Sequence, residues 1–368
     1  KAVTTPTWAG RARFPSGPLM LKEAASLRSI SLLACLPLCL WSPAAGAESV
    51  TPLLVEFGNT RSVLWGILEE RPRGAATAAF RLADQLALNP DRESLPYLVG
   101  TSLTFAPVLK YDRNVNNGFK NGTIHIWGLP FSVEEAEKAV TIGGAVSGGV
   151  SLGLAKGTTL TLGARSEYQR AIGKKFEVFD TTGFLSLDHT TQNWTYLNAT
   201  YLVNEEKRAL GTGNVKIASF TAGKLFGQGG SHLHDVSGTF SRVQDNSTWQ
   251  SRARVDWTGS FAGHGVFRFG LERGETIDGV LLPRTTVTGS YANIMLGAPT
   301  TLSAYYSERV GGDFFGEIRN DDVYRVGITR KITDRVSLHG SYEYKDSTND
   351  SFDESGIDIG FSVTGFSF

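Results

Sequence analysis

The chain has 368 residues, with 36 Lys and Arg against 36 Asp and Glu, and a hydrophobic fraction of 41%. This length allows one large domain or two ordinary ones. Balanced charge argues against a general nucleic-acid binder. The 42 glycines, together with many Ser, Thr and Tyr residues, suit a protein of strands and turns better than a helical protein.

The N-terminal region has the pattern of a secretion signal. A basic stretch from Met20 to Arg28 precedes an apolar run over residues 30–41, and Ala45-Gly46-Ala47 forms a cleavage site before Glu48. The apolar run of roughly a dozen residues is too short for a membrane helix, which needs about twenty. We therefore interpret residues 1–47 as upstream residues plus a signal peptide.

Both cysteines, Cys35 and Cys39, lie inside this signal. A lipoprotein alternative would use Cys35, but it leaves only about five residues for an apolar core where about seven to fifteen are expected. The predicted mature chain therefore contains no cysteine, which excludes disulfides and thiol chemistry.

Residues 48–98 differ from the rest of the chain because their apolar residues recur with a helical period. This period predicts a helix over residues 73–88 that stops at Asn89-Pro90, with a shorter helix around 61–69 before it. The stretch Ala79–Pro90 is similar to the second helix of a tetratricopeptide repeat. A single repeat cannot bury its own face. The segment is therefore expected to be either a remnant that packs on the following domain or a short plug.

Residues 99–368 predict an all-β domain, a transmembrane antiparallel barrel of about 14 strands. Each expected strand is roughly ten to fifteen residues long, whereas soluble strands usually have about five or six and a tilted strand crossing a bilayer needs about nine to eleven. The expected strands are 101–113, 139–155, 158–170, 178–189, 193–204, 214–226, 232–243, 248–261, 265–273, 284–297, 300–309, 321–332, 335–346 and 355–368.

Apolar and polar residues alternate along the clearest of these segments. Val255 and Trp257 face one way, while Arg252, Arg254 and Asp256 face the other. This pattern is typical of a barrel with an apolar outside and a polar inside. The residues that we expect to line the lumen are Arg165, Glu167, Arg252, Arg254, Asp256, Arg268, Glu272, Arg325, Glu343 and Lys345. They form either a conducting surface or a salt-bridged network that fills a narrow barrel.

The connections between the expected strands alternate between long and short. The long ones are 114–138, 171–177, 205–213, 244–247, 274–283, 310–320 and 347–354, and the short ones are 156–157, 190–192, 227–230, 262–264, 298–299 and 333–334. Bacterial outer-membrane barrels have an even strand number, long external loops and short periplasmic turns. The pattern therefore predicts a Gram-negative outer-membrane protein with both termini in the periplasm.

The C-terminal segment, Ser355 to Phe368, alternates and ends on an aromatic residue. This ending predicts an assembly signal for the barrel-assembly machinery, carried by Phe361, Phe366 and Phe368. Because Phe366 and Phe368 depart from the register of the preceding apolar residues, we expect a bulge near Gly365.

No catalytic pattern accompanies the barrel pattern. Four of the six histidines, His189, His232, His234 and His264, lie next to the expected short turns, and the pair His232 and His234 beside Asp235 is more typical of turn chemistry than of a metal site. There is no Gly-x-Ser-x-Gly, no zinc-ligand spacing and no Gly-rich phosphate loop. The sequence predicts no enzyme, no cofactor and no metal.

The stretch Tyr111-Asp112-Arg113-Asn114-Val115-Asn116-Asn117, the stretch Tyr342-Glu343-Tyr344-Lys345-Asp346-Ser347-Thr348-Asn349 and the Phe-ended last strand carry a family resemblance. Over about residues 75–368 the chain resembles the surface lipoprotein assembly modifiers, or Slam proteins. The resemblance implies tetratricopeptide repeats before a fourteen-stranded outer-membrane barrel, and translocation of client lipoproteins or other proteins to the cell surface. The helical segment here is shorter than that family's repeat domain, which puts client recognition through it in doubt.

Two alternatives to translocation stay open. The first is a passive porin or small-solute channel, since fourteen strands lie between filled eight-stranded barrels and open sixteen-stranded porins. The second is a structural or adhesive barrel that acts through its loops. The first loop, residues 114–138, would then form a surface patch, whereas in a channel it could dip into the lumen. The expected partners are outer-membrane lipid, the barrel-assembly machinery and a client protein, with no nucleic acid.

Overall fold

The structure is a computed structural model that describes residues 49–89, 94, 96–119, 122–126, 129–228, 230–363 and 366–367. The predicted upstream residues and signal peptide, residues 1–47, lie outside the described residues. So do Gly365, where a bulge was expected, and Phe368 of the predicted assembly signal. Phe366 is described as part of a strand, without its side chain.

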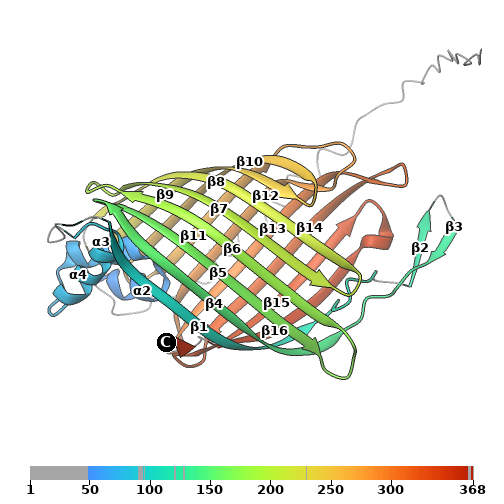
Figure 1. Cartoon of the computed structure of the whole chain (residues 1–368), viewed down its shortest axis with the longest axis horizontal. Helices are drawn as coiled ribbons and strands as arrows, with labels where there is room; N and C mark the ends of the chain where they lie inside the picture. Colours follow the sequence, from blue (N-terminus) through green and yellow to red (C-terminus); the bar gives the residue numbers. More distant parts are fainter. Residues whose placement is uncertain are drawn as a thin grey trace, which may run out of the picture. The chain divides into compact units, whose positions relative to one another are not determined.

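Fourteen strands of the described chain close into one antiparallel barrel (Figure 1). Each pairs with its neighbour in sequence, and the last returns to the first, which confirms the predicted fold class. The strands are β1 (Tyr97–Asp112), β4 (Ala139–Ala155), β5 (Thr158–Ala171), β6 (Glu177–Thr190), β7 (Thr195–Arg208), β8 (Gly211–Gln228), β9 (His232–Asp245), β10 (Thr248–Phe261), β11 (Gly265–Gly274), β12 (Leu282–Met295), β13 (Ala298–Phe314), β14 (Glu317–Lys331), β15 (Val336–Ser347) and β16 (Glu354–Val363). A further short strand, β17 (Phe366–Ser367), pairs with β1.

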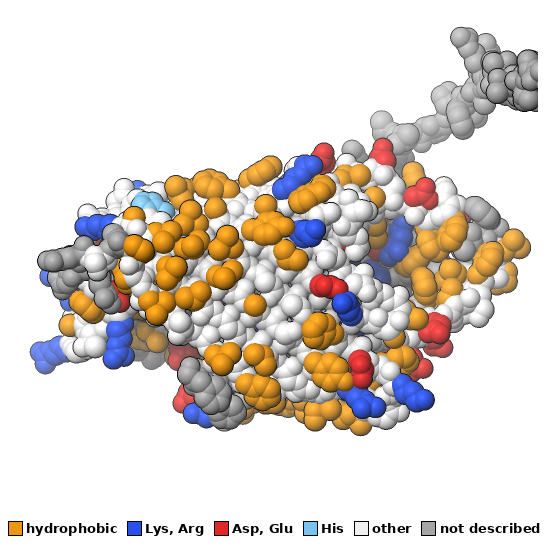
Figure 2. Space-filling model, in the orientation of Figure 1, with side chains coloured by type: hydrophobic (Ala, Val, Ile, Leu, Met, Phe, Trp, Pro, Cys, Tyr) orange, Lys and Arg blue, Asp and Glu red, His pale blue; other side chains and the backbone are white. Residues whose placement is uncertain are grey.

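Alternate residues of each strand point outward, and many of these outward residues are apolar. Large side chains such as Ile142, Leu162, Phe240 and Val255 are exposed, Val255 to 59%. Figure 2 shows such side chains spread over the visible face of the strands. An apolar surface this extensive is costly in water and is typical of a barrel that faces lipid.

Several strands extend further than the sequence predicted. The expected long loops 205–213 and 310–320 are largely strand, since Arg208 pairs with Gly211 and Phe314 pairs with Glu317. The loop expected at 244–247 is likewise a tight hairpin, in which Asp245 pairs with Thr248. The sequence prediction was wrong here because backbone pairing continues past the point where apolar alternation stops. Polar side chains on both faces do not prevent a hairpin.

The first long connection contains its own hairpin, formed by β2 (Thr123–Ile126) and β3 (Leu129–Ser132). In Figure 1 this hairpin lies at the opposite end of the barrel from the helices. A 3-10 turn, η2 (Asp350–Phe352), precedes β16.

The described chain begins with three short helices, α2 (Thr51–Phe57), α3 (Thr60–Glu70) and α4 (Ala76–Gln85). Two of them match the helices predicted over 61–69 and 73–88, and α2 was not predicted. α3 starts where the Asn59 side chain accepts a hydrogen bond from the Ser62 amide, an ordinary N-cap. None of the described helices is long and apolar enough to cross a membrane.

Candidate lumen and its two mouths

The inward face of β10 and β11 carries polar side chains that pair along the barrel wall. Arg252 Nη1 lies 3.4 Å from Glu272 Oε1 on the neighbouring strand. Arg254 Nη2 lies 2.6 Å from Asp256 Oδ1 on its own strand and donates to Thr288 Oγ1 at 3.1 Å. These partners lie on the same strand, on the adjacent one or, for Thr288 of β12, one strand further along the wall. The side chains therefore follow the wall and do not cross the barrel.

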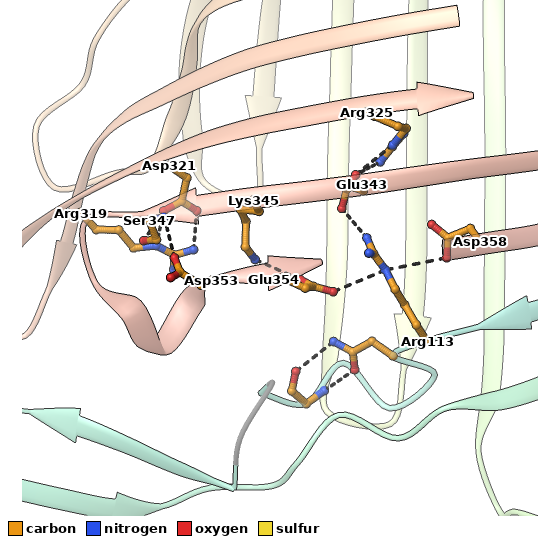
Figure 3. Close-up of polar contacts among 12 residues, drawn as sticks. Arg113, Arg319, Asp321, Arg325, Glu343, Lys345, Ser347, Asp353, Glu354 and Asp358 are labelled. Carbon is orange, nitrogen blue, oxygen red and sulfur yellow. Dashed lines mark hydrogen bonds and ion pairs between the residues drawn. The ribbon is translucent and has the colours of Figure 1, made fainter. Parts of the chain in front are cut away.

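The other predicted lumen residues follow the same rule. Arg165 pairs with Glu167 two residues along β5. Arg325 of β14 donates through Nε to Glu343 Oε2 of β15 at 2.9 Å, and Lys345 Nζ lies 3.1 Å from Glu354 Oε2 of β16 (Figure 3). Positively and negatively charged side chains therefore pair with near neighbours on the wall, and little net charge remains.

Arg268 is the exception among the predicted residues, because its partner is outside the barrel strands. Its Nη2 donates to the backbone carbonyl of Phe57, the last residue of α2. We refer to the end of the barrel where α2 and α3 lie as the helix end. The opposite end, which carries β2 and β3, is the loop end.

α2 and α3 form one compact unit. Glu70 of α3 accepts hydrogen bonds from the Val50 and Thr51 amides at 3.1 and 3.2 Å, and so caps the start of α2. Gly66 allows the helices to approach closely, since a Cβ there would lie 2.9 Å from both Leu54 Cδ1 and Thr51 Oγ1. The two helices are therefore closely packed on each other.

This helix pair packs on inward-facing residues of the barrel wall. One buried cluster joins the helix side to strands β7 to β9; its members are Val50, Leu54, Trp65, Tyr196, Leu225 and Leu233. A second cluster joins Leu53 to Val266 of β11 and Ala292 of β12. The Val50 amide also donates to the Gly230 carbonyl in the turn between β8 and β9, at 3.0 Å. Burial of these apolar side chains is the main source of docking stability.

Two ion pairs hold the helix pair to opposite sides of the barrel. Arg61 Nη2 lies 3.3 Å from Asp188 Oδ1 of β6, and its guanidinium lies 4.0 Å from the centre of the Tyr196 ring. Lys331 Nζ of β14 lies 3.3 Å from Glu56 Oε2. In the closed strand order β14 is six steps from β6 through β15, β16, β1, β4 and β5, and eight steps the other way. The helix pair therefore reaches from one wall to the nearly opposite one.

The loop end is covered differently, by the base of the first long loop. Val115 and Asn116 are completely buried, and Val115 packs on the inward-facing residues Ala139, Ala171 and Val178 of β4 to β6. Arg208 of β7 joins this base, since its Nη1 lies 3.0 Å from Asp112 Oδ2 and donates to the Asn114 carbonyl at 2.8 Å. The base of the loop thus folds inward, while Leu129 and Phe131 of the hairpin are exposed.

Several of these polar residues were missed by the sequence analysis. Arg113, Glu354 and Asp358 form a cluster with Glu343 (Figure 3). The sequence pattern does place Asp358 on the face opposite Ile357 and Ile359, but Asp358 was not included among the expected lumen residues. No local sequence pattern predicts the pair of Arg61 and Asp188, because the two residues are 127 positions apart.

The histidine pair that sequence analysis singled out lies in an aromatic group. The His232 and His234 rings are 5.3 Å apart, and the His234 ring stacks on Trp257 at 6.0 Å. Trp257 Nε1 donates to His234 Nδ1 at 3.3 Å. Among the described residues no group of three or more His, Cys, Asp or Glu side chains is arranged to hold a metal ion.

No family model matches the chain, and no curated protein matches it in sequence. Solved barrels are similar in fold. Outer membrane protein OprD of Pseudomonas aeruginosa has 8% identity and a TM-score of 0.41 over 75% of this chain and 96% of its own. A Rhodopseudomonas blastica porin has 12% identity and a TM-score of 0.40, over 73% and 99%. CdiB from Acinetobacter baumannii has 11% identity and a TM-score of 0.39 over 73% of this chain, which spans only 60% of CdiB. At these scores the likenesses carry no argument about function.

Proposed function

We propose that the chain is a channel of the Gram-negative outer membrane whose helix end is closed at rest by α2 and α3. The proposal places the helix end and both termini in the periplasm. The lumen-lining residues would be Arg165, Glu167, Arg252, Arg254, Asp256, Arg268, Glu272, Arg325, Glu343 and Lys345.

The observation that carries this proposal is the arrangement of charge on the inner wall. Arg252 with Glu272, Arg254 with Asp256, and Arg325 with Glu343 all pair between neighbouring positions of the wall. A network that filled the barrel would instead join strands far apart. Both signs are present, so the channel is expected to pass small polar solutes with little preference for cations or anions.

The membrane placement is supported by the exposed apolar residues around the closed barrel. A closed barrel leaves no free edge along most of its circumference, as a lipid environment requires. The assembly signal predicted at Phe361, Phe366 and Phe368 belongs to the same proposal.

The polypeptide translocation implied by the resemblance to Slam proteins is a second candidate. It is favoured by the helix pair that reaches from β6 to β14, since a lumen wide enough for a polypeptide needs a closed resting state. The described chain has three helices, fewer than the repeat domain of that family contains. Recognition of a client would therefore need another part of the chain.

Single-channel conductance in planar bilayers tests the proposal. The full chain is compared with the variant Arg61→Ala/Lys331→Ala, which removes the ion pairs at both walls. The matched control is Arg71→Ala/Arg73→Ala, which removes two exposed arginines of the same segment. We expect a silent full chain and control, rare openings in the first variant, and frequent openings in Leu54→Asp, because apolar contact contributes more to docking than the ion pairs.

The other outcomes separate the candidates. Large steady openings in the full chain would mean an open porin that the helices do not block. Silence in every variant, including Leu54→Asp, which removes the apolar contact as well, would overturn the channel.

A further inference from the structure

Among the described residues, the first strand of the barrel and the last long strand pair at few positions. β1 and β16 pair at three positions, namely Val108 with Ser362, Leu109 with Phe361 and Lys110 with Gly360. On its other edge β1 pairs with β4 at fifteen positions, Tyr97 to Asp112. β17 adds two pairs with β1, at Thr104 and Phe105, nearer the helix end.

Both strands continue beyond this ladder towards the loop end without pairing to each other. In this described part of the chain, Tyr111 and Asp112 have partners only in β4, and Glu354–Ile359 has partners only in β15. Ile357 and Ile359 point outward and are more than half exposed. The bare edge therefore lies beside apolar side chains, where unpaired backbone groups are hardest to satisfy.

The side chain of Arg113 lies across the inward face of β16 next to this edge (Figure 3). Its Nε lies 3.5 Å from Glu354 Oε1 and 3.7 Å from Asp358 Oδ1, and its Nη2 pairs with Glu343. Burial alone would lower the pKa of Arg113, but the carboxylates of Glu354, Asp358 and Glu343 raise it above its ordinary value. The guanidinium is therefore a permanent positive charge.

Arg113 lies directly against the backbone of β16 and leaves one donor unused. A Cβ added at Gly356 would be 2.8 Å from Arg113 Nη1. That same Nη1 is buried and has no hydrogen-bond partner in the described chain. A cavity of about 510 Å³ lined by Arg113, Glu354, Gly356 and Ile357 opens beside it. Arg113 thus contacts three carboxylates from the inward face of β16, and Arg325 and Lys345 share in balancing Glu343 and Glu354.

We propose that the edge Glu354–Ile359 of β16 binds an extended polypeptide segment as an added strand, with basic residues alternating with apolar ones. Backbone hydrogen bonds would satisfy the bare edge, as in other cases of strand addition. The apolar side chains would face outward beside Ile357 and Ile359. The basic ones would face inward between Glu354 and Asp358 and displace Arg113. This goes beyond the proposed channel, which needs no polypeptide ligand.

A binding measurement with two synthetic peptides tests this inference. The probe is a fluorescent seven-residue peptide that alternates valine and arginine, and the control peptide has glutamate at each arginine position. Fluorescence anisotropy is measured on the full chain extracted from outer membranes. We expect the arginine peptide to bind at least tenfold more tightly than the glutamate peptide.

Substitutions of Arg113 and of its carboxylate partners are expected to change binding in opposite directions. Glu354→Gln/Asp358→Asn is expected to weaken binding of the arginine peptide at least tenfold, and Arg113→Ala to strengthen it severalfold. Arg284→Ala is the matched control, because Arg284 of β12 pairs with Glu308 of β13, away from this edge. It should leave binding unchanged. Slower migration of boiled samples on gels verifies that each barrel is folded. Equal binding of both peptides, or no effect of Arg113→Ala, would overturn the proposal.

The position of the bound peptide is tested with a photo-crosslinking amino acid in place of Ser355, which is exposed beside the edge. A crosslink to the arginine peptide supports the assignment. A crosslink to a second copy of the chain that the peptide does not suppress would overturn it, since the edge would then be a dimer contact. No conductance is read in either experiment, so failure here is separate from failure of the channel.

Discussion

The two ends of the barrel are covered by different means. The helix end is covered by α2 and α3, a unit outside the barrel strands that is held by the Arg61–Asp188 and Glu56–Lys331 ion pairs and by apolar packing. The loop end is covered on one side by the base of the first loop, which continues directly from β1 and into β4. A cover that only packs on the wall can leave as a body, whereas one continuous with two strands can only rearrange. The helix end is therefore the mouth suited to gating.

The largest expected effect comes from the apolar contact at the helix end. Leu54 is almost fully buried against wall residues such as Leu225 and Leu233. Leu54→Asp places a charge in this contact, and loss of a buried leucine alone costs about 2–5 kcal/mol. Trypsin should then cleave after Arg61, which the docked helices protect, while the barrel stays folded. The matched control is Val55→Asp, because Val55 is 60% exposed on the same helix. Protection of Arg61 in the Leu54 variant would contradict the docking role of this contact.

A change inside the helix pair should have a smaller effect. Gly66→Leu inserts a side chain where Leu54 and Thr51 already lie within contact distance. Overpacking of this kind costs about 1–3 kcal/mol. Hydrogen exchange should increase in α2 and α3 and stay unchanged in the strands. Leu68→Ala, at an exposed position two residues later, serves as control. Equal exchange in the Gly66 variant and the control would mean that α2 and α3 are not one unit.

The loop end is tested by Arg208→Ala, which removes the partner of Asp112 and of the Asn114 carbonyl. Asp112 is then left buried with fewer partners, and we expect a cost of about 1–3 kcal/mol, because a buried polar group that loses a hydrogen-bond partner is not resolvated. Hydrogen exchange should rise at residues 112–118 and not in the helices. Lys207→Ala removes an exposed neighbour that pairs with Glu205 and should change nothing. Faster exchange in α2 or α3 would show that the two ends are coupled.

The sequence analysis predicted the barrel well because lipid exposure imposes a two-residue period that can be counted along one strand, as at Val255 and Arg254. It predicted less at the two mouths. The contacts of Arg61, Arg208 and Arg113 join segments far apart in sequence, and such pairs depend on how the barrel closes. The length of the Arg208 hairpin was also missed, since polar strands that extend past the apolar band have no period that distinguishes them from loops.

The smallest expected effect comes from the ion pair between Arg61 and Asp188. Its size shows how much this pair contributes to holding the helices on the barrel. Arg61 and Asp188 are both partly exposed to solvent, so their pairing is worth about 0.2–1 kcal/mol. Arg61→Ala alone should raise hydrogen exchange in α2 and α3 only slightly, and the increase should vanish at high salt because screening weakens the pair in the unmodified chain as well. A double-mutant cycle with Asp188→Asn checks that the effect belongs to this pair. If Arg61→Ala released the helices as fully as Leu54→Asp, the stacking of Arg61 on Tyr196 would be the main anchor and the apolar contact would be secondary.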